Sequence, residues 1–192
     1  MTNKITIHAL VQTHLKHHFG KVKELALKEI IGDLTIHVIP SSPERDYIIL
    51  STSGAKLSNE QEHYELLMYL PENWNLTDFN DLTQYWPIAW LRKIAYYDGM
   101  VSPENTFSNE ETYEPLAPNI QWSGFLILPE PCEYGKIGRH KGKAVSFLNV
   151  IPLYKEEIEL KQKAGTNELL ERFQRNGITM VLDLDRPNVG LI

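Results

Sequence analysis

Asp33-Leu-Thr-Ile-His-Val-Ile39 and Tyr47-Ile-Ile-Leu-Ser-Thr52 are the two stretches that decide the fold, and a Pro-Ser-Ser-Pro turn at 40–43 separates them. Both stretches are rich in β-branched residues and alternate in polarity, which is typical of strands with one buried face. Gly32 and Pro40 bound the first stretch. The pattern therefore predicts two neighbouring strands, at 33–39 and 47–52.

Three more apolar runs outside this pair are predicted to be core strands. They are His63–Leu70, Trp122–Leu128 and Ala144–Ile151, and each is followed by a proline. The continuous apolar middle of His63–Leu70 indicates burial on both faces of the sheet. Residues 22–30 fit both strand alternation and helical spacing in part and are predicted to be a strand, and a last strand is predicted at 178–184.

Apolar residues at helical spacing predict helices at 4–19, 87–97 and 153–164, and a further helix from 168 to 173. Gly20 is expected to end the first helix, and Pro87 is expected to lie in the first turn of the second. Residues 98–119 lose all periodicity, which indicates a functional or mobile loop. This order predicts an α+β fold, with a mixed, mostly antiparallel sheet flanked by helices in a single domain spanning 1–192.

The composition excludes several classes of protein. The chain has 192 residues, 42% of them hydrophobic, and its net charge of −6 disfavours direct binding to nucleic acid. Its single cysteine, Cys132, cannot form an internal disulfide framework, and no secretory signal precedes the fold. No apolar run approaches the roughly 20 residues that span a bilayer. We therefore expect a cytoplasmic protein with no membrane contact.

The negative charge is concentrated in the middle of the chain. Residues 57–135 hold 13 acidic and 2 basic side chains, and also 14 of the 19 aromatic residues, including all four tryptophans. Carboxylates interleaved with aromatic side chains suit contact with a basic protein partner. The alternative is that the aromatic residues form the core and the carboxylates are merely solvated.

Two groups of residues suggest metal binding, but neither forms a persuasive site. His14, His17 and His18 lie at i, i+3 and i+4 of the predicted first helix, yet Lys16 lies between them and no glutamate serves as a base. Asp183 and Asp185 would point the same way along a strand, without a third ligand. A solvated helix end and a capped strand end explain these groups more simply.

Other candidate sites are equally incomplete. The glycine- and lysine-rich stretch Gly135–Lys143 could bind an anion, but its spacing is not that of a P-loop, and a hairpin between two strands accounts for it. Cys132 lies among acidic residues, which raise a thiol pKa. Ser51, Ser53 and Gly54 lack the strand-turn-helix setting of a nucleophile elbow. We therefore expect no enzyme activity, no metal and no cofactor.

The stretch from Asp33 to Gly54 resembles the suppressor-of-fused-like domain family. The later segments Tyr64–Pro71, Tyr85–Leu91, Gly124–Pro129 and Ile151–Ile158 follow in the family's order. Together these segments cover most of residues 5–175. The His-rich start, the 98–119 loop and the tail after Leu184 do not align.

The resemblance implies a mixed α/β domain that binds proteins and has no known catalytic role. The family's larger animal members hold transcription factors of the Hedgehog pathway by using a further domain, for which this chain has no room. Bacterial members of about this size are similar to immunity proteins, and this sequence looks closest to the antitoxin of an LXG-type toxin and immunity pair.

The resemblance and the charge pattern together predict a binding surface. A secreted nuclease toxin presents a basic cleft, so the residues expected to face it are Glu104, Glu110, Glu111, Tyr113 and Glu114. An alternative is a regulatory adaptor that adds a partner peptide to an exposed sheet edge. A metal-dependent hydrolase built on the histidines or on Asp183 and Asp185 is a third possibility.

Overall fold

A computed structural model of the chain describes residues 5–25, 33–97, 103–108 and 111–192. Its helices are α1 (Ile7–Phe19), α2 (Leu82–Ala95), α3 (Lys155–Ala164) and α4 (Thr166–Arg175), with a short 3-10 helix, η1 (Glu133–Gly135). Its strands are β1 (Lys23–Glu24), β2 (Thr35–Ile39), β3 (Tyr47–Ser53), β4 (Glu62–Pro71), β5 (Thr106–Ser108), β6 (Trp122–Pro129), β7 (Lys136–His140) and β8 (Lys143–Tyr154).

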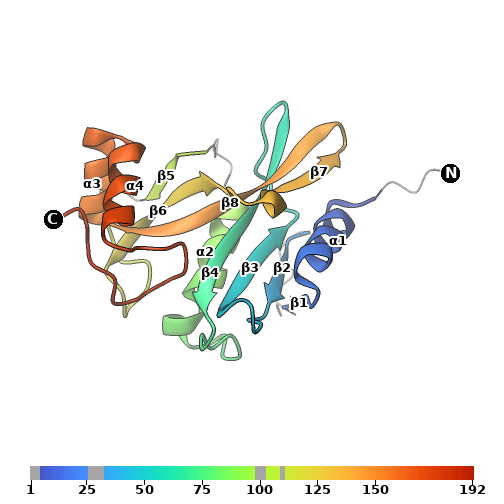
Figure 1. Cartoon of the computed structure of the whole chain (residues 1–192), viewed down its shortest axis with the longest axis horizontal. Helices are drawn as coiled ribbons and strands as arrows, with labels where there is room; N and C mark the ends of the chain where they lie inside the picture. The colour runs from blue at the N-terminus through green and yellow to red at the C-terminus, as the bar shows by residue number, and fades with distance from the viewer. Residues whose placement is uncertain (1–4, 26–32, 98–102, 109–110) are drawn as a thin grey trace.

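The strands form one sheet in the order β1-β2-β3-β4-β8-β6-β5, and β7 pairs with β8 outside this path (Figure 1). Within the described ranges every strand pair is antiparallel except β4 with β8. The two stretches that open the sequence analysis are the neighbouring strands β2 and β3, with Ile39 opposite Ile49. The predicted α+β fold with a mixed, mostly antiparallel sheet is confirmed.

The long strand β8 divides its pairing between two parts of the sheet. Its first half pairs with β4, up to Leu67 opposite Asn149, and its second half pairs with β6. Beyond Leu67, therefore, β4 has no β8 residue beside it. The C-terminal tail takes that place through a single bridge, Tyr69 to Val181, in which Leu182 N donates to Tyr69 O at 2.9 Å.

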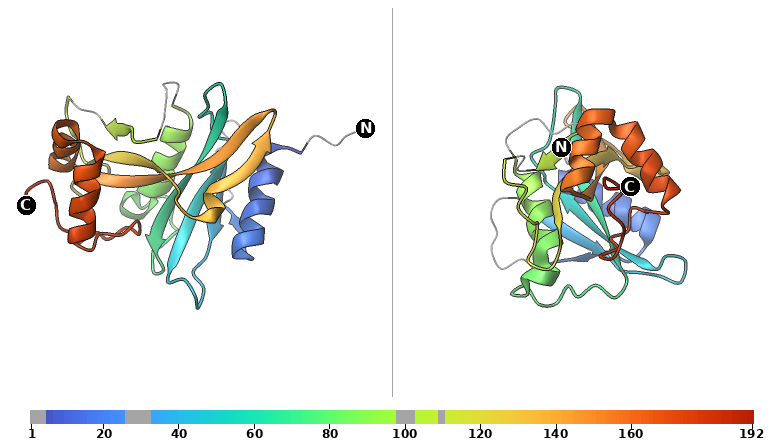
Figure 2. Two further views of the ribbon diagram at one scale, coloured as in Figure 1. Left: turned by 45° about the horizontal axis from the view of Figure 1, so that its top comes forward. Right: turned by 90° about the vertical axis from the view of Figure 1, so that its left-hand side faces the viewer.

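Helices cover both faces of this sheet (Figure 2). On one face, α2 packs on the largest core cluster, which includes Leu66, Met68 and Phe125. On the other face, α1 packs against Leu67 and Phe147, while α3 and α4 pack against the end of the sheet formed by β6 and β8. Because successive residues of β4 enter different clusters, its apolar run is buried on both faces, as predicted.

Three of the predicted helices are confirmed with small shifts at their ends, and the second begins earlier than expected. Asp81 caps α2 by accepting a hydrogen bond from Thr83 N at 2.9 Å, so the helix begins at Leu82. The prediction that Pro87 lies in the first turn is wrong, because Pro87 lies inside the helix. The apolar spacing that predicts this helix starts at Ile88, so Thr83 and Gln84 in its first turn give no sign of the earlier start.

Several predictions for the loops and the tail are also wrong. Residues 178–184 form no strand beyond the Val181 bridge, because only one residue there pairs with the sheet. The aperiodic 98–119 segment contains β5, whose three residues are too few to show a period. Gly135–Lys143 is predicted to be a hairpin connection between two strands, but most of it, Lys136–His140, is itself a strand that pairs with β8. Of the predicted 22–30 strand, the structure shows β1, and residues 26–32 lie outside the described part.

Candidate functional site

The predicted binding residues that the structure describes lie around the edge strand β5. Backbone hydrogen bonds from Glu104 N to Ile127 O (2.7 Å) and from Ile127 N to Asn105 O (2.9 Å) hold the start of this segment on β6. The pairing continues to Ser108, opposite Gly124. Since β5 is the last strand in the sheet order, its outer edge has no strand partner in the described part of the chain.

Three of the five predicted residues are exposed carboxylates that flank this strand. Glu104 precedes β5, while Glu111 and Glu114 follow it. Glu110 lies outside the described residues. We call β5 together with Glu104, Glu111 and Glu114 the acidic edge. The fold therefore places the last strand of the described sheet between carboxylates, an arrangement that suits a basic partner.

Tyr113, the fifth predicted residue, is partly a packing residue. It is half-buried and packs against the core cluster beneath α3 and α4. The Lys155 ammonium lies 5.2 Å from its ring centroid, a cation–π contact. Its backbone is left-handed, with φ of 47°, and Glu104 has φ of 70°. Such conformations are rare for residues other than glycine, so the surrounding packing fixes the backbone on both sides of β5.

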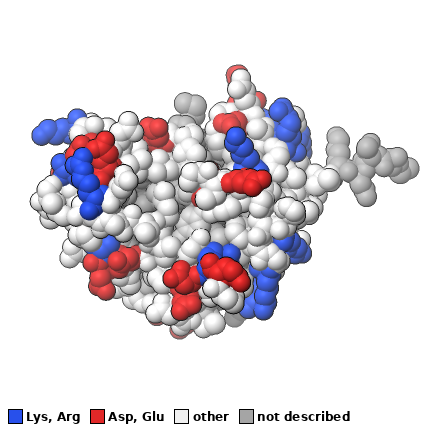
Figure 3. Space-filling view, in the orientation of Figure 1, with Lys and Arg blue, Asp and Glu red and all other residues white. Residues whose placement is uncertain are grey.

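A second candidate site is a groove of about 990 Å³ between β4 and the C-terminal tail. We call it the tail groove. It is visible as a hollow near the centre of the face shown in Figure 3. Its walls come from the ends of β3 and β4, the turn after β4, helix α2, the segment between β6 and β7, and the tail. The lining residues are Asp46, Tyr47, Tyr69, Pro71, Asn73, Trp74, Gln84, Glu130, Pro131, Cys132, Tyr134 and the tail residues 179–185.

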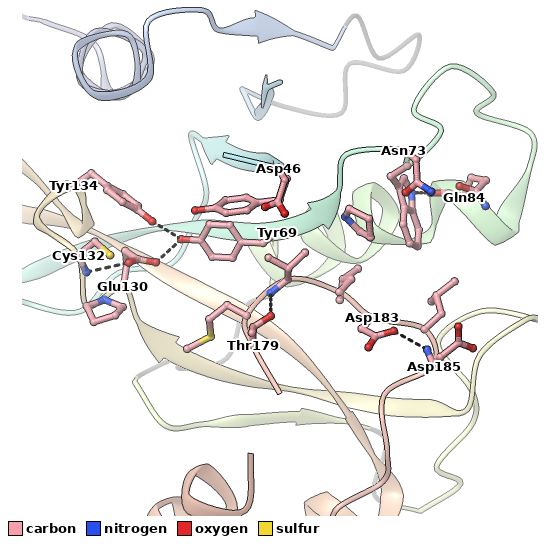
Figure 4. A pocket seen from close by; sticks show the side chains of 18 residues that line it. Asp46, Tyr69, Asn73, Gln84, Glu130, Cys132, Tyr134, Thr179, Asp183 and Asp185 are labelled. Carbon is pink, nitrogen blue, oxygen red and sulfur yellow. Dashed lines mark hydrogen bonds between the residues drawn. The ribbon is translucent and has the colours of Figure 1, made fainter. Parts of the chain in front are cut away.

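Every charged residue that lines the tail groove is acidic. The four carboxylates belong to Asp46, Glu130, Asp183 and Asp185, and among the described residues the lining holds no Lys, Arg or His. Asp46, Asp183 and Asp185 are exposed. Figure 4 shows Glu130 toward one end of the groove, Asp46 close to Tyr69, and Asp183 with Asp185 toward the other end.

Glu130 is held in place by a hydrogen-bond network. It accepts bonds from the Tyr69 hydroxyl, from Asn149 Nδ2 at 2.8 Å and from Cys132 N at 2.9 Å. The Tyr69 and Tyr134 hydroxyls are 3.0 Å apart. Burial raises the pKa of both tyrosines, so both stay protonated at neutral pH. Their rings and the Glu130 carboxylate therefore form a rigid end of the groove.

Cys132 lies in this network and is an exposed thiol. A hydrogen bond with Glu130 and burial both raise its pKa. The direction of this shift agrees with the expectation from sequence that its acidic surroundings raise the thiol pKa.

A buried ion pair fixes the tail that forms the groove's far wall. Arg186 binds Glu157 through two hydrogen bonds, Nη1 to Oε1 at 2.6 Å and Nη2 to Oε2 at 2.7 Å. Glu157 is fully buried and Arg186 is 7% exposed. Arg186 Nη2 also donates to Pro152 O at 2.8 Å, and the guanidinium lies over the ring of Tyr154. The tail is thus tied to β8 and α3.

The histidines of α1 are engaged with neighbouring groups. His14 Nε2 donates to Tyr134 O at 2.8 Å, and burial lowers the pKa of His14. The ring centroids of His14 and His18 are 4.6 Å apart, and those of His17 and His18 are 5.0 Å apart. Within the described ranges no three His, Cys, Asp or Glu side chains are grouped as metal ligands would be.

The other residues considered as candidates also have structural contacts. Asp183 Oδ1 accepts a hydrogen bond from Asp185 N at 3.0 Å in a turn, so the two do not alternate along a strand as predicted. Lys143 at the β7–β8 hairpin donates to Asn59 O at 2.5 Å. Ser53 is fully buried, with His8 Nδ1 and His37 Nε2 each 2.8 Å from its Oγ. None of the helices in the described part is long and apolar enough to cross a membrane.

Sequence reasoning missed the tail groove. Its lining residues come from six separate segments, and only the sparse positive charge of residues 57–135 hinted at an acidic surface.

The comparisons with known proteins agree with the fold. The family model for "Suppressor of fused protein (SUFU)" matches residues 33–187. No curated protein matches the chain. A SUFU homologue from Neisseria gonorrhoeae FA 1090 is similar, with a TM-score of 0.67 and 19% identity over 95% of this chain and 96% of that one.

Two further solved structures are similar at 14% identity and a TM-score of 0.66. One is a chain of a Sufu–Fu complex, with 97% of this chain and 93% of that one covered. The other is Drosophila Suppressor of Fused, with 97% of this chain and 51% of that one covered. This chain therefore spans about half of the Drosophila chain, and at these identities the likeness concerns the fold.

Proposed function

The chain belongs to the suppressor of fused protein family, and from that premise we propose that it is an immunity protein. It binds a cognate secreted toxin, a nuclease of the LXG type, and neutralises it by direct protein contact. The observation that carries this proposal is the acidic edge, where three exposed carboxylates flank β5, the last strand of the sheet in the described residues. The proposed role is cytoplasmic and non-catalytic, and it uses no cofactor, membrane or nucleic acid.

The chemistry of a nuclease explains why such a surface would neutralise it. A nuclease binds phosphates with a cleft rich in Lys and Arg, and carboxylates can occupy or flank the same cleft. Glu104, Glu111 and Glu114 are exposed, and the sheet holds the backbone of Glu104 through its hydrogen bond to Ile127 O, so little order is lost there on binding. Complementary charge also speeds the encounter of the two proteins.

The family supports a role in protein binding. A similar chain has been crystallised in a Sufu–Fu complex. For the present chain, the partner and the docking surface are our proposal. The toxin-facing residues remain those predicted from the sequence, Glu104, Glu110, Glu111, Tyr113 and Glu114.

The first test is co-expression with the toxin encoded beside this chain, scored by survival and then by co-purification over a salt series. We expect rescue and a stable complex that weakens as salt rises. The variant Glu111→Lys should slow association about three- to tenfold at low salt and flatten the salt dependence. Glu60→Lys, in the exposed turn before β4, makes the same charge change away from the acidic edge.

The outcomes separate the docking site from the function. Rescue with equal effects of the two lysine variants would place the contact elsewhere on the protein. Absence of both rescue and complex would contradict the immunity function.

The outer edge of β5, which has no strand partner among the described residues, also supports a second candidate, a regulatory adaptor that pairs with an extended peptide. An adaptor would bind short linear peptides on their own. An immunity protein would need the folded toxin domain and would bind it far more tightly. Calorimetric titration with toxin-derived peptides and with the intact toxin domain distinguishes the two.

A further inference from the structure

The tail groove is separate from the acidic edge, because the two share no residue. It exists because β8 leaves β4 after Leu67 and the tail returns to β4 at one bridge only, between Tyr69 and Val181. On one side Trp74 Nε1 donates to Gln84 O at 2.9 Å, and on the other the Arg186–Glu157 pair anchors the tail. The groove is therefore built from fixed walls.

We propose that the tail groove binds an extended segment of a protein partner that carries at least two Lys or Arg side chains. The first argument is charge complementarity. All four charged residues of the lining are acidic, and in the described part Asp46, Asp183 and Asp185 form no ion pair. A cationic side chain would gain these contacts without displacing an existing one.

The second argument is the spacing of the carboxylates. They are distributed along the groove, from Glu130 toward one end to Asp185 toward the other (Figure 4). Within the described ranges no three of them are gathered as metal ligands would be. A volume of about 990 Å³ is near the upper end of the range for ligand pockets, about 300–1,000 Å³. The arrangement suits an elongated ligand with separated positive charges.

The third argument is the chemistry of the walls. Tyr47 and Tyr69 meet edge to face, with 5.5 Å between their centroids. The Arg45 guanidinium already lies over the Tyr47 ring, so Tyr69 and Trp74 are the rings that offer aromatic surface to a further guanidinium or ammonium group. Met180 and Leu182 suit the methylene stems of Lys and Arg. The amide side chains of Asn73 and Gln84 also line the groove and can pair with peptide groups, which a simple polyamine lacks.

The test uses the intact protein and a hexa-arginine peptide as the probe, with hexa-glutamate and spermine for comparison. Binding is measured by calorimetry at two salt concentrations. The side-chain methyl signal of Met180, in the groove, is followed by NMR, with that of Met68 in the core as the internal reference. We expect hexa-arginine to shift the Met180 signal and leave the Met68 signal in place.

Two matched variants locate the binding. Asp46→Asn, Asp183→Asn and Asp185→Asn together remove three charges from the groove, and Asn at 183 keeps the oxygen that caps the turn. The control carries Glu104→Gln, Glu111→Gln and Glu114→Gln, which remove three charges from the acidic edge. We expect at least tenfold weaker binding in the groove variant and less than threefold in the control.

Several outcomes would overturn the proposal. These are no binding by the native protein, equal weakening in both variants, an unmoved Met180 signal, or spermine binding as tight as that of the peptide. Toxin rescue is scored in a separate experiment, so the result for peptide binding in the tail groove stands whether or not the immunity function fails.

Discussion

Replacing Arg186 with methionine should be among the most destabilising substitutions in this protein. The change removes two charge-assisted hydrogen bonds, of 2.6 and 2.7 Å, from Glu157. The carboxylate stays buried and keeps two backbone donors, Tyr154 N at 3.0 Å and Val189 N at 3.1 Å. Pro152 O also loses its 2.8 Å donor. Breaking one side of a buried ion pair in this way costs about 3–5 kcal/mol.

Urea unfolding followed by tryptophan fluorescence measures this effect. With a slope of about 2 kcal/mol per molar urea, the loss lowers the midpoint by about 1.5–2.5 M. Arg175→Met is the matched control, since its ion pair with Glu171 is exposed and should contribute less than about 1 kcal/mol. Adding Glu157→Gln to Arg186→Met should recover part of the loss, because no charge is then left buried. Equal midpoints for Arg186→Met and Arg175→Met would refute the reasoning.

Three further predictions follow from close packing and from perturbed pKa values. In Gly124→Ala the new Cβ would lie 2.6 Å from Ser108 Cβ and 2.9 Å from Ile158 Cδ1, so β5 must shift. We expect the free energy of unfolding, measured by thermal unfolding, to fall by about 1–3 kcal/mol and toxin binding to weaken. An unchanged melting temperature would contradict this. Burial lowers the pKa of His37 below its usual 6.5 in the folded protein, so as pH falls the histidine of the unfolded chain is protonated first. The free energy of unfolding should therefore fall as pH drops below about 6.5. In urea titrations at several pH values, His37→Gln should make this free energy depend less steeply on pH. Burial and the Glu62 hydrogen bond raise the pKa of Tyr64 to about 12. In an ultraviolet pH titration, Tyr64→Phe should therefore remove the signal of a tyrosine that ionises well above pH 10. If the variant instead lacks a tyrosine that ionises near pH 10, the assignment is contradicted.

The two proposed surfaces differ in how far the sequence revealed them. The acidic edge was predicted because Glu104, Glu111 and Glu114 lie close together in a stretch without Lys or Arg. The edge strand between them was not, because three residues are too few to show a period. The tail groove was missed entirely, since Asp46 and Asp185 are far apart in the chain and meet only in the folded protein.

By itself, the sequence determined most helices and core strands, the mostly antiparallel α+β class and the acidic middle of the chain. These features depend on local periodicity, turn residues and composition, which a single stretch of chain records. Only the tertiary structure decided that β8 leaves β4 after Leu67, that the tail returns at Val181 and that Arg186 meets Glu157. Such contacts join residues 29 or more positions apart, and their energy depends on burial and geometry that no local pattern encodes.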